Sequence, residues 1–104
     1  MVELRALLAK ATGIDGVVCS PLEAARVRQI LGDSALVVTP GVRAAGPRAD
    51  DQLRTATAYA AVLAGASHVV VGRPILQAPD PVAVTRVLLD EIVTASDKQR
   101  VSHA

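Results

Sequence analysis

The sequence has almost no aromatic residues and almost no net charge. Its 104 residues include no Phe, no Trp and one Tyr, and the formal net charge is +1. Nucleic-acid binding relies on a basic surface and, for single strands, on aromatic stacking platforms. We therefore expect no nucleic-acid partner. Because Cys19 is the one cysteine, an internal disulfide framework and a multi-cysteine zinc site are excluded.

Long hydrophobic runs are also missing. No apolar stretch approaches the roughly 18 residues that a membrane-spanning helix needs. The first residues lack the charged region and apolar region of a signal peptide. Neither His68 nor His103 stands at a metal-ligand spacing. We therefore expect a cytoplasmic protein without membrane contact or a metal site.

Small aliphatic residues are abundant instead. The chain has 19 Ala and 16 Val, and 51% of all residues are hydrophobic. Such side chains suit buried parallel strands and helices packed closely over them. Charged residues of both signs make up 20% of the chain, which argues against intrinsic disorder.

Helical apolar spacing alternates with short apolar runs along the chain. The predicted helices cover residues 2–11, 20–31, 51–64 and 80–95, and the predicted strands cover 15–19, 35–39 and 68–71. A short connection is expected at 73–76. The order α-βα-βα-βα indicates an α/β fold with a parallel sheet of three strands covered by helices. We expect a folded part over residues 1–95 and a frayed polar tail over 96–104.

The same spacing predicts which helix residues are buried. These are Leu4, Leu7, Leu8 and Ala11 in the first helix, Leu53, Ala56, Ala60, Leu63 and Ala64 in the third, and Val84, Val87, Leu88 and Ile92 in the last. Ser20 and Glu23 have the spacing of a capping box at the start of the second helix. Asp80 precedes a proline and is predicted to cap the last helix.

The predicted strand ends carry residues suited to an anion. Ligands of parallel α/β folds bind beyond the carboxyl ends of the strands. Gly72 and Arg73 follow one strand, and Arg43 and Gln52 follow another. Glycine permits a close backbone approach, and the planar guanidinium suits phosphate. These four residues therefore predict an anion site, most simply for a phosphate.

The residues alone leave a second interpretation open. Arg43, Arg48 and Arg54 could be solvated loop residues that pair with Asp50 and Asp51. Nucleophilic chemistry finds less support, because no histidine lies near Cys19 in sequence and a buried small hydrophobe explains that residue.

Three blocks of sequence carry a family resemblance. They are DGVVCSPLEA at 15–24, VTPGVR at 38–43 with DQLR at 51–54, and VVVGRPI at 69–75 followed by Asp80-Pro81. In this order and spacing they resemble the orotidine 5′-phosphate decarboxylase family, over roughly residues 13–95. The third block also occurs in related sugar-phosphate decarboxylases and synthases. The second block argues against that alternative.

The resemblance implies a fold and a set of binding residues. The family fold is a (β/α)₈ TIM barrel, which typically needs about 250 residues. The chain resembles its carboxyl-terminal part, and is thus expected to form a partial barrel. By motif match, Arg43, Gln52, Gly72 and Arg73 bind the substrate, the last three at the 5′-phosphate, and Pro40 lies near the pyrimidine. The implied ligands are orotidine and uridine 5′-phosphate, and the reaction converts orotidylate to uridylate and CO2 without a cofactor.

The family's catalytic residues have no counterpart in this sequence. They stand in an Asp-x-Lys-x-x-Asp motif, whereas the only lysines here are Lys10 and Lys98, without aspartates at that spacing. We therefore assign no catalytic residue, and expect no decarboxylation by the isolated chain. The sequence also departs from the family pattern at Ala58 and Tyr59, and this second departure affects only the start of a helix.

The alternative function is an assembly module. A partial barrel with open edges and an uncovered inner face would form homo-oligomers or join a complementary barrel fragment.

Overall fold

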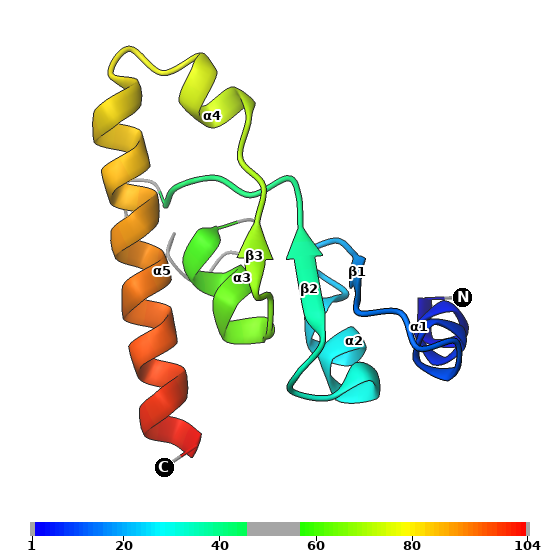
Figure 1. Ribbon diagram of the computed structural model, residues 1–104. Helices are drawn as coiled ribbons and strands as arrows, with labels where there is room; N and C mark the ends of the chain where they lie inside the picture. The colour runs from blue at the N-terminus through cyan, green and yellow to red at the C-terminus, as the bar shows by residue number, and fades with distance from the viewer. Residues whose placement is uncertain (1, 46–56, 104) are drawn as a thin grey trace.

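The computed structural model describes residues 2–45 and 57–103 of the chain (Figure 1). Its elements follow the predicted alternation of helices and strands, with one short helix added. They are α1 (Val2–Ala11), β1 (Gly16–Val18), α2 (Ala24–Leu31), β2 (Leu36–Thr39), α3 (Ala58–Ala64), β3 (His68–Val69), α4 (Arg73–Leu76) and α5 (Pro81–His103). In the part that the structure describes, no helix is both long and apolar enough to cross a membrane.

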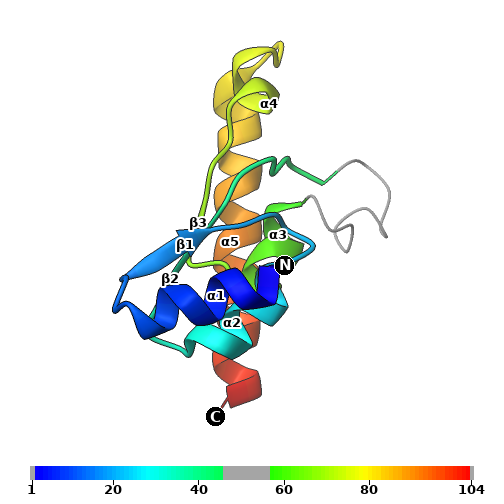
Figure 2. The ribbon, with the colours of Figure 1, turned by 90° about the vertical axis from the view of Figure 1, so that its right-hand side faces the viewer.

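The three strands form one parallel sheet, as predicted, and their order in the sheet is β1-β2-β3. Val18 pairs with Val38, and Val38 pairs with His68. The helices α2 and α3 lie on one side of this sheet (Figures 1 and 2). Val37 of β2 packs against Ala24 and Val27 of α2. All three strands point toward the end of the molecule that carries α4 (Figure 1).

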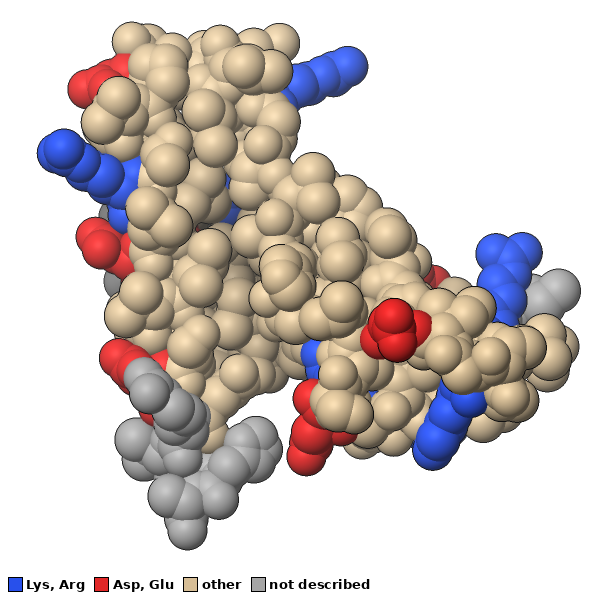
Figure 3. Space-filling view, in the orientation of Figure 1, with Lys and Arg blue, Asp and Glu red and all other residues tan. Residues whose placement is uncertain are grey.

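The other face of the sheet is uncovered. Side chains alternate along a strand, so Val18, Leu36 and Val70 share the face opposite to that of Val37. Their exposed fractions are 70%, 46% and 52%. The middle of this face carries mostly uncharged residues (Figure 3). The predicted open inner face is therefore confirmed.

Helix α1 turns its small residues inward, against the prediction for this helix. Ala6 and Ala9 are buried, whereas Leu4, Leu7 and Leu8 are 54–57% exposed. Small side chains let the backbones of α1 and α2 approach each other closely. The leucine stripe consequently points away from α2, and the prediction that it is buried is wrong.

Helix α3 begins later than predicted. Thr57 is extended, with φ −83° and ψ 153°, and its hydroxyl accepts a hydrogen bond from the Ala60 amide at 3.2 Å. This cap makes a continuous helix over 51–64 impossible, because a helix cannot run through an extended residue. The buried face of α3 also differs from the predicted stripe, because α3 packs against α5. The buried residues are Ala58, Tyr59, Ala61 and Val62, while Ala60, Leu63 and Ala64 are half-buried. Leu53 and Ala56 lie outside the described residues.

The carboxyl-terminal region is more helical than predicted. Residues 73–76 form the one-turn helix α4 instead of a plain connection. Asp80 caps α5 as predicted, with its Oδ1 accepting from the Ala83 amide at 3.1 Å. Of the predicted buried residues of α5, Val87 is 44% exposed.

The predicted frayed tail from residue 96 is wrong, because α5 continues to His103. Ala95 is fully buried in a cluster with Tyr59 and Val62. The Gln99 side chain donates to the Val62 carbonyl, and also to the Leu63 carbonyl at 3.3 Å. These contacts with the end of α3 keep the polar sequence helical.

Arg28 ties the amino ends of two strands together. Its Nε donates to the Gly65 carbonyl at 2.9 Å, and its Nη1 donates to the carbonyls of Gly32 and Ala35 at 2.8 and 2.7 Å. Gly65 precedes β3, and the other two residues precede β2. Gly65 has φ +122°, and a Cβ there would lie 2.8 Å from the Arg28 side chain. Glycine is therefore required at this turn.

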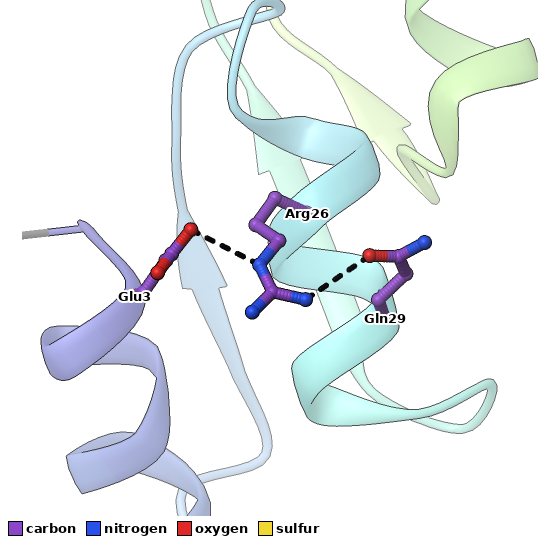
Figure 4. Close-up of polar contacts among 3 residues, drawn as sticks. All are labelled: Glu3, Arg26 and Gln29. Carbon is purple, nitrogen blue, oxygen red and sulfur yellow. Dashed lines mark hydrogen bonds and ion pairs between the residues drawn. The ribbon is translucent and has the colours of Figure 1, made fainter.

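Arg28→Met should lower the free energy of unfolding by about 2 kcal/mol or more, because three backbone carbonyls lose a charged donor. Arg26→Met is the matched control on the same helix. Arg26 contacts Glu3 at 3.1 Å and Gln29 at 3.2 Å in an exposed position (Figure 4), so its loss should cost under about 1 kcal/mol. Urea titrations measure both values. Equal losses for the two variants would contradict the assigned role of Arg28.

Candidate functional site

A hollow of about 390 Å³ lies at the carboxyl ends of β2 and β3. Its lining residues are Gly41, Val42, Arg43, Val70, Gly72, Arg73 and Pro74. Among these described residues, two are arginines and none is acidic. The hollow is therefore a cationic site at the edge of the sheet where ligands of parallel α/β folds bind.

The loop after β2 places Arg43 at the hollow. Gly41 turns the chain with φ +74°, which a side-chain-bearing residue rarely adopts. Val42 is 1% exposed and anchors the loop in the core beside Ala58. The Arg43 carbonyl accepts from the Ala58 amide at 3.1 Å, and the Arg43 Nη1 donates to the Ala44 carbonyl at 3.0 Å. The backbone of Arg43 is thus held by the start of α3.

The loop after β3 places Gly72 and Arg73. The Val70 amide donates to the Thr39 carbonyl at 2.9 Å, which continues the sheet pairing beyond β3. The Gly72 carbonyl then accepts from Ile75 and Leu76 at 3.0 Å each and starts α4. A Cβ built on Gly72 would meet no described heavy atom within 4 Å. The space beside this glycine is therefore open to a ligand.

Glu91 of α5, which was not predicted from the sequence, contacts the backbone of the same region. It is 7% exposed. Its Oε2 accepts from the Ala45 amide at 3.0 Å, and its Oε1 accepts from the Tyr59 amide at 3.2 Å. The available signal was its position three residues after Leu88 and four before Ala95, within the apolar stripe of the helix.

The structure brings together three of the five predicted binding residues. Arg43, Gly72 and Arg73 line one hollow. Pro40 is exposed and is not among the lining residues. Gln52 lies outside the described residues. So do Arg48, Arg54, Asp50 and Asp51, on which the alternative interpretation of surface ion pairs depends.

Cys19 follows β1 at the same end of the sheet. Burial raises the pKa of its thiol above the ordinary value, and the Glu23 carboxylate raises it further. The nearby Thr39 side chain and the charge of Arg28 lower the pKa, but they offset only part of this increase. The thiol is therefore protonated near neutral pH, which is unfavourable for a nucleophile.

Ser20 is engaged with Glu23, but not as the predicted cap. The Ser20 hydroxyl and amide both donate to Glu23 Oε1, at 2.9 and 3.3 Å. The hydroxyl of a capping residue would instead accept from a backbone amide. Helix α2 begins only at Ala24, after a turn, so one half of the capping box forms.

The remaining predicted candidates lie away from the hollow. His68 stands at the amino end of β3, with its Nδ1 3.1 Å from Ser67 Oγ. Across residues 2–45 and 57–103, no group of three His, Cys, Asp or Glu side chains could hold a metal ion.

The fold and the hollow define a class of protein: consecutive βα units of a parallel β/α barrel, with a cationic site formed by the loops after two neighbouring strands. Comparison with known proteins then gives the family. The chain matches the Orotidine 5′-phosphate decarboxylase / HUMPS family model over residues 1–88 and belongs to this family.

Individual relatives agree with this assignment. The chain is 54% identical over 96 residues to an orotidine 5′-phosphate decarboxylase of Rhodopseudomonas palustris strain BisA53, covering 92% of this chain and 41% of the relative. The crystal structure of an orotidine 5′-phosphate decarboxylase from Lactobacillus acidophilus matches with a TM-score of 0.69 and 40% identity, over 86% of this chain and 35% of that one. An orotidine 5′-phosphate decarboxylase structure from Pyrococcus horikoshii OT3 matches with a TM-score of 0.66 and 27% identity, over 86% and 40%.

The match is extensive on this chain and partial on its relatives. The chain spans about 41% of the length of the curated Rhodopseudomonas relative. Its three strands and their helices correspond to part of a TIM barrel, so the predicted fold class is confirmed.

The rate of Cys19 alkylation by iodoacetamide, measured against pH, should give a thiol pKa higher in the folded chain than in urea. Glu23→Gln removes a charge that raises this pKa, so the profile should shift to lower pH. Glu3→Gln removes an exposed carboxylate of α1 and serves as the control. A Glu23→Gln profile that coincides with the wild-type profile would contradict the assigned cause.

Proposed function

We propose that this chain supplies the phosphate-binding part of an orotidine 5′-phosphate decarboxylase, the enzyme that converts orotidylate to uridylate and CO2 in pyrimidine biosynthesis. The observation that carries the proposal is the shared hollow of Arg43, Gly72 and Arg73 at the carboxyl ends of two parallel strands. Family membership supplies the substrate class.

The chemistry of the hollow fits a phosphate monoester. Two guanidinium groups offer planar, permanently charged donors for phosphate oxygens. The open space beside Gly72 allows the ligand to reach backbone there. A hollow of about 390 Å³ has the size of a small-ligand site. Gln52 would add a neutral donor, and Pro40 would approach the pyrimidine.

The reacting groups of this enzyme would come from another part of the barrel. The chain has only two lysines, Lys10 and Lys98, and neither stands in an Asp-x-Lys-x-x-Asp motif. Binding energy from a remote phosphate can support chemistry at the distant ring, but it does not replace the acid and base. The proposed role of this chain is therefore substrate binding within a larger assembly.

A second candidate is an assembly module, which the exposed apolar surfaces favour. The uncovered sheet face exposes Val18, Leu36 and Val70, and α1 exposes Leu4 and Leu7. Exposed apolar patches of this kind mark contact surfaces. We propose that they meet a second copy of the chain or a complementary part of the barrel. A role confined to assembly would leave the hollow without a ligand.

Uridine 5′-phosphate should bind the chain more tightly than uridine does, by about tenfold or more, because each charged hydrogen bond to phosphate contributes about 1.5–3 kcal/mol. Calorimetry measures the affinity of the chain for both ligands. Arg73→Ala, Arg43→Ala and Gly72→Val should each reduce the difference, whereas the distant Arg26→Ala should preserve it. Equal affinities for the nucleotide and the nucleoside would remove the phosphate assignment.

Light scattering should find dimers or larger species, because the sheet exposes apolar side chains. Replacing Val18, Leu36 and Val70 together by Thr should shift the distribution toward monomer. The control replaces Leu22 and Leu76, which are 77% and 81% exposed away from the sheet face, by Thr. A monodisperse wild-type monomer with a cooperative melt would count against assembly through this face.

A further inference from the structure

We infer that Glu91 is a positioning residue for the hollow. Its carboxylate holds the backbone of the loop that carries Arg43 and thereby sets where the guanidinium stands. The inference rests on the proposed phosphate site and adds to it a residue that lies on α5, outside the lining of the hollow.

The contacts of Glu91 connect the loop that carries Arg43 with the start of α3. One carboxylate oxygen accepts from the Ala45 amide, two residues after Arg43, and the other accepts from the Tyr59 amide. The neighbouring Ala58 amide donates to the Arg43 carbonyl at 3.1 Å. Glu91 thus joins the loop and the start of α3, and the bond from Ala58 transmits this constraint to Arg43.

The burial of the Glu91 carboxyl group is unfavourable by itself, which indicates that its hydrogen bonds have a specific role. Its neighbours on the inner side of α5, Leu88, Ile92 and Ala95, are apolar and pack in the core clusters. Burying a carboxyl group among them is unfavourable unless its oxygens are hydrogen-bonded. Both oxygens are bonded here, and their partners among the described residues are backbone amides near Arg43. A leucine at this position would pack, but it would leave two amides without an acceptor.

Gln99 provides an internal comparison on the same helix. Its side chain also reaches from α5 to the backbone of α3, where it contacts the carbonyls of Val62 and Leu63. These residues lie at the far end of α3 from the hollow. Gln99 therefore joins the same two helices without holding Arg43. It distinguishes the effect of joining α3 to α5 from the effect of positioning Arg43.

The experiment compares Glu91→Gln with Gln99→Ala in the full chain. The amide of Glu91→Gln has one acceptor oxygen instead of two, so one backbone amide loses its partner. Hydrogen exchange is measured at Ala45, Tyr59 and Ala58, and calorimetry measures uridine 5′-phosphate and uridine. Glu91 does not bond Ala58, so exchange there reports on the Arg43 loop itself.

Glu91→Gln should speed exchange at all three amides by about tenfold or more and reduce the preference for the nucleotide by a similar factor. Gln99→Ala should change neither the exchange rates at these amides nor the preference for the nucleotide, even if it lowers the free energy of unfolding as much as Glu91→Gln does. The inference is overturned if exchange at Ala58 is unchanged in Glu91→Gln, or if both variants lose the preference to the same extent. If the wild-type chain shows no preference for the nucleotide, the proposed function fails, while the exchange at Ala58 still decides whether Glu91 positions the loop.

Discussion

A parallel sheet has to be covered on both faces, because its connections pass over it and its strands are apolar throughout. This chain covers one face with α2 and α3 and leaves the other to solvent. This arrangement explains why the buried side chains are small on the face covered by helices and why valines are exposed on the open face. The chain spans about 41% of the length of the Rhodopseudomonas relative, which is more than twice as long. The other features of the structure depend on this uncovered face.

The two ends of the sheet have separate tasks. At the amino ends, the guanidinium of Arg28 donates to three carbonyls and thereby holds the turns before the strands together. At the carboxyl ends, Arg43 and Arg73 border a hollow. The same side-chain type is thus structural at one end and available for an anion at the other. This division is the one expected of β/α barrels, in which the carboxyl-terminal face holds the chemistry.

Much of the fold could be predicted from the sequence, since the order of helices and strands follows from periodicity and from Gly and Pro positions. The parallel sheet and the pairing of Arg43 with Gly72 and Arg73 in one site followed in the same way. The errors have a common physical origin in tertiary packing. Alanines, not leucines, face α2 in helix α1, and the Gln99 contact keeps a polar segment helical. The position of Glu91 within the apolar stripe of α5 was a signal of burial, but its partners could not be predicted, because the amides of Ala45 and Tyr59 are distant in sequence.

The residues that line the hollow come from two loops joined by a single βα unit. The described lining residues are therefore encoded in one short continuous stretch of gene, and the codon for Glu91 follows soon after. A recombination event that moves this stretch would transfer these lining residues together. Such a segment is a natural unit of inheritance, because the described residues that line its hollow are transferred together.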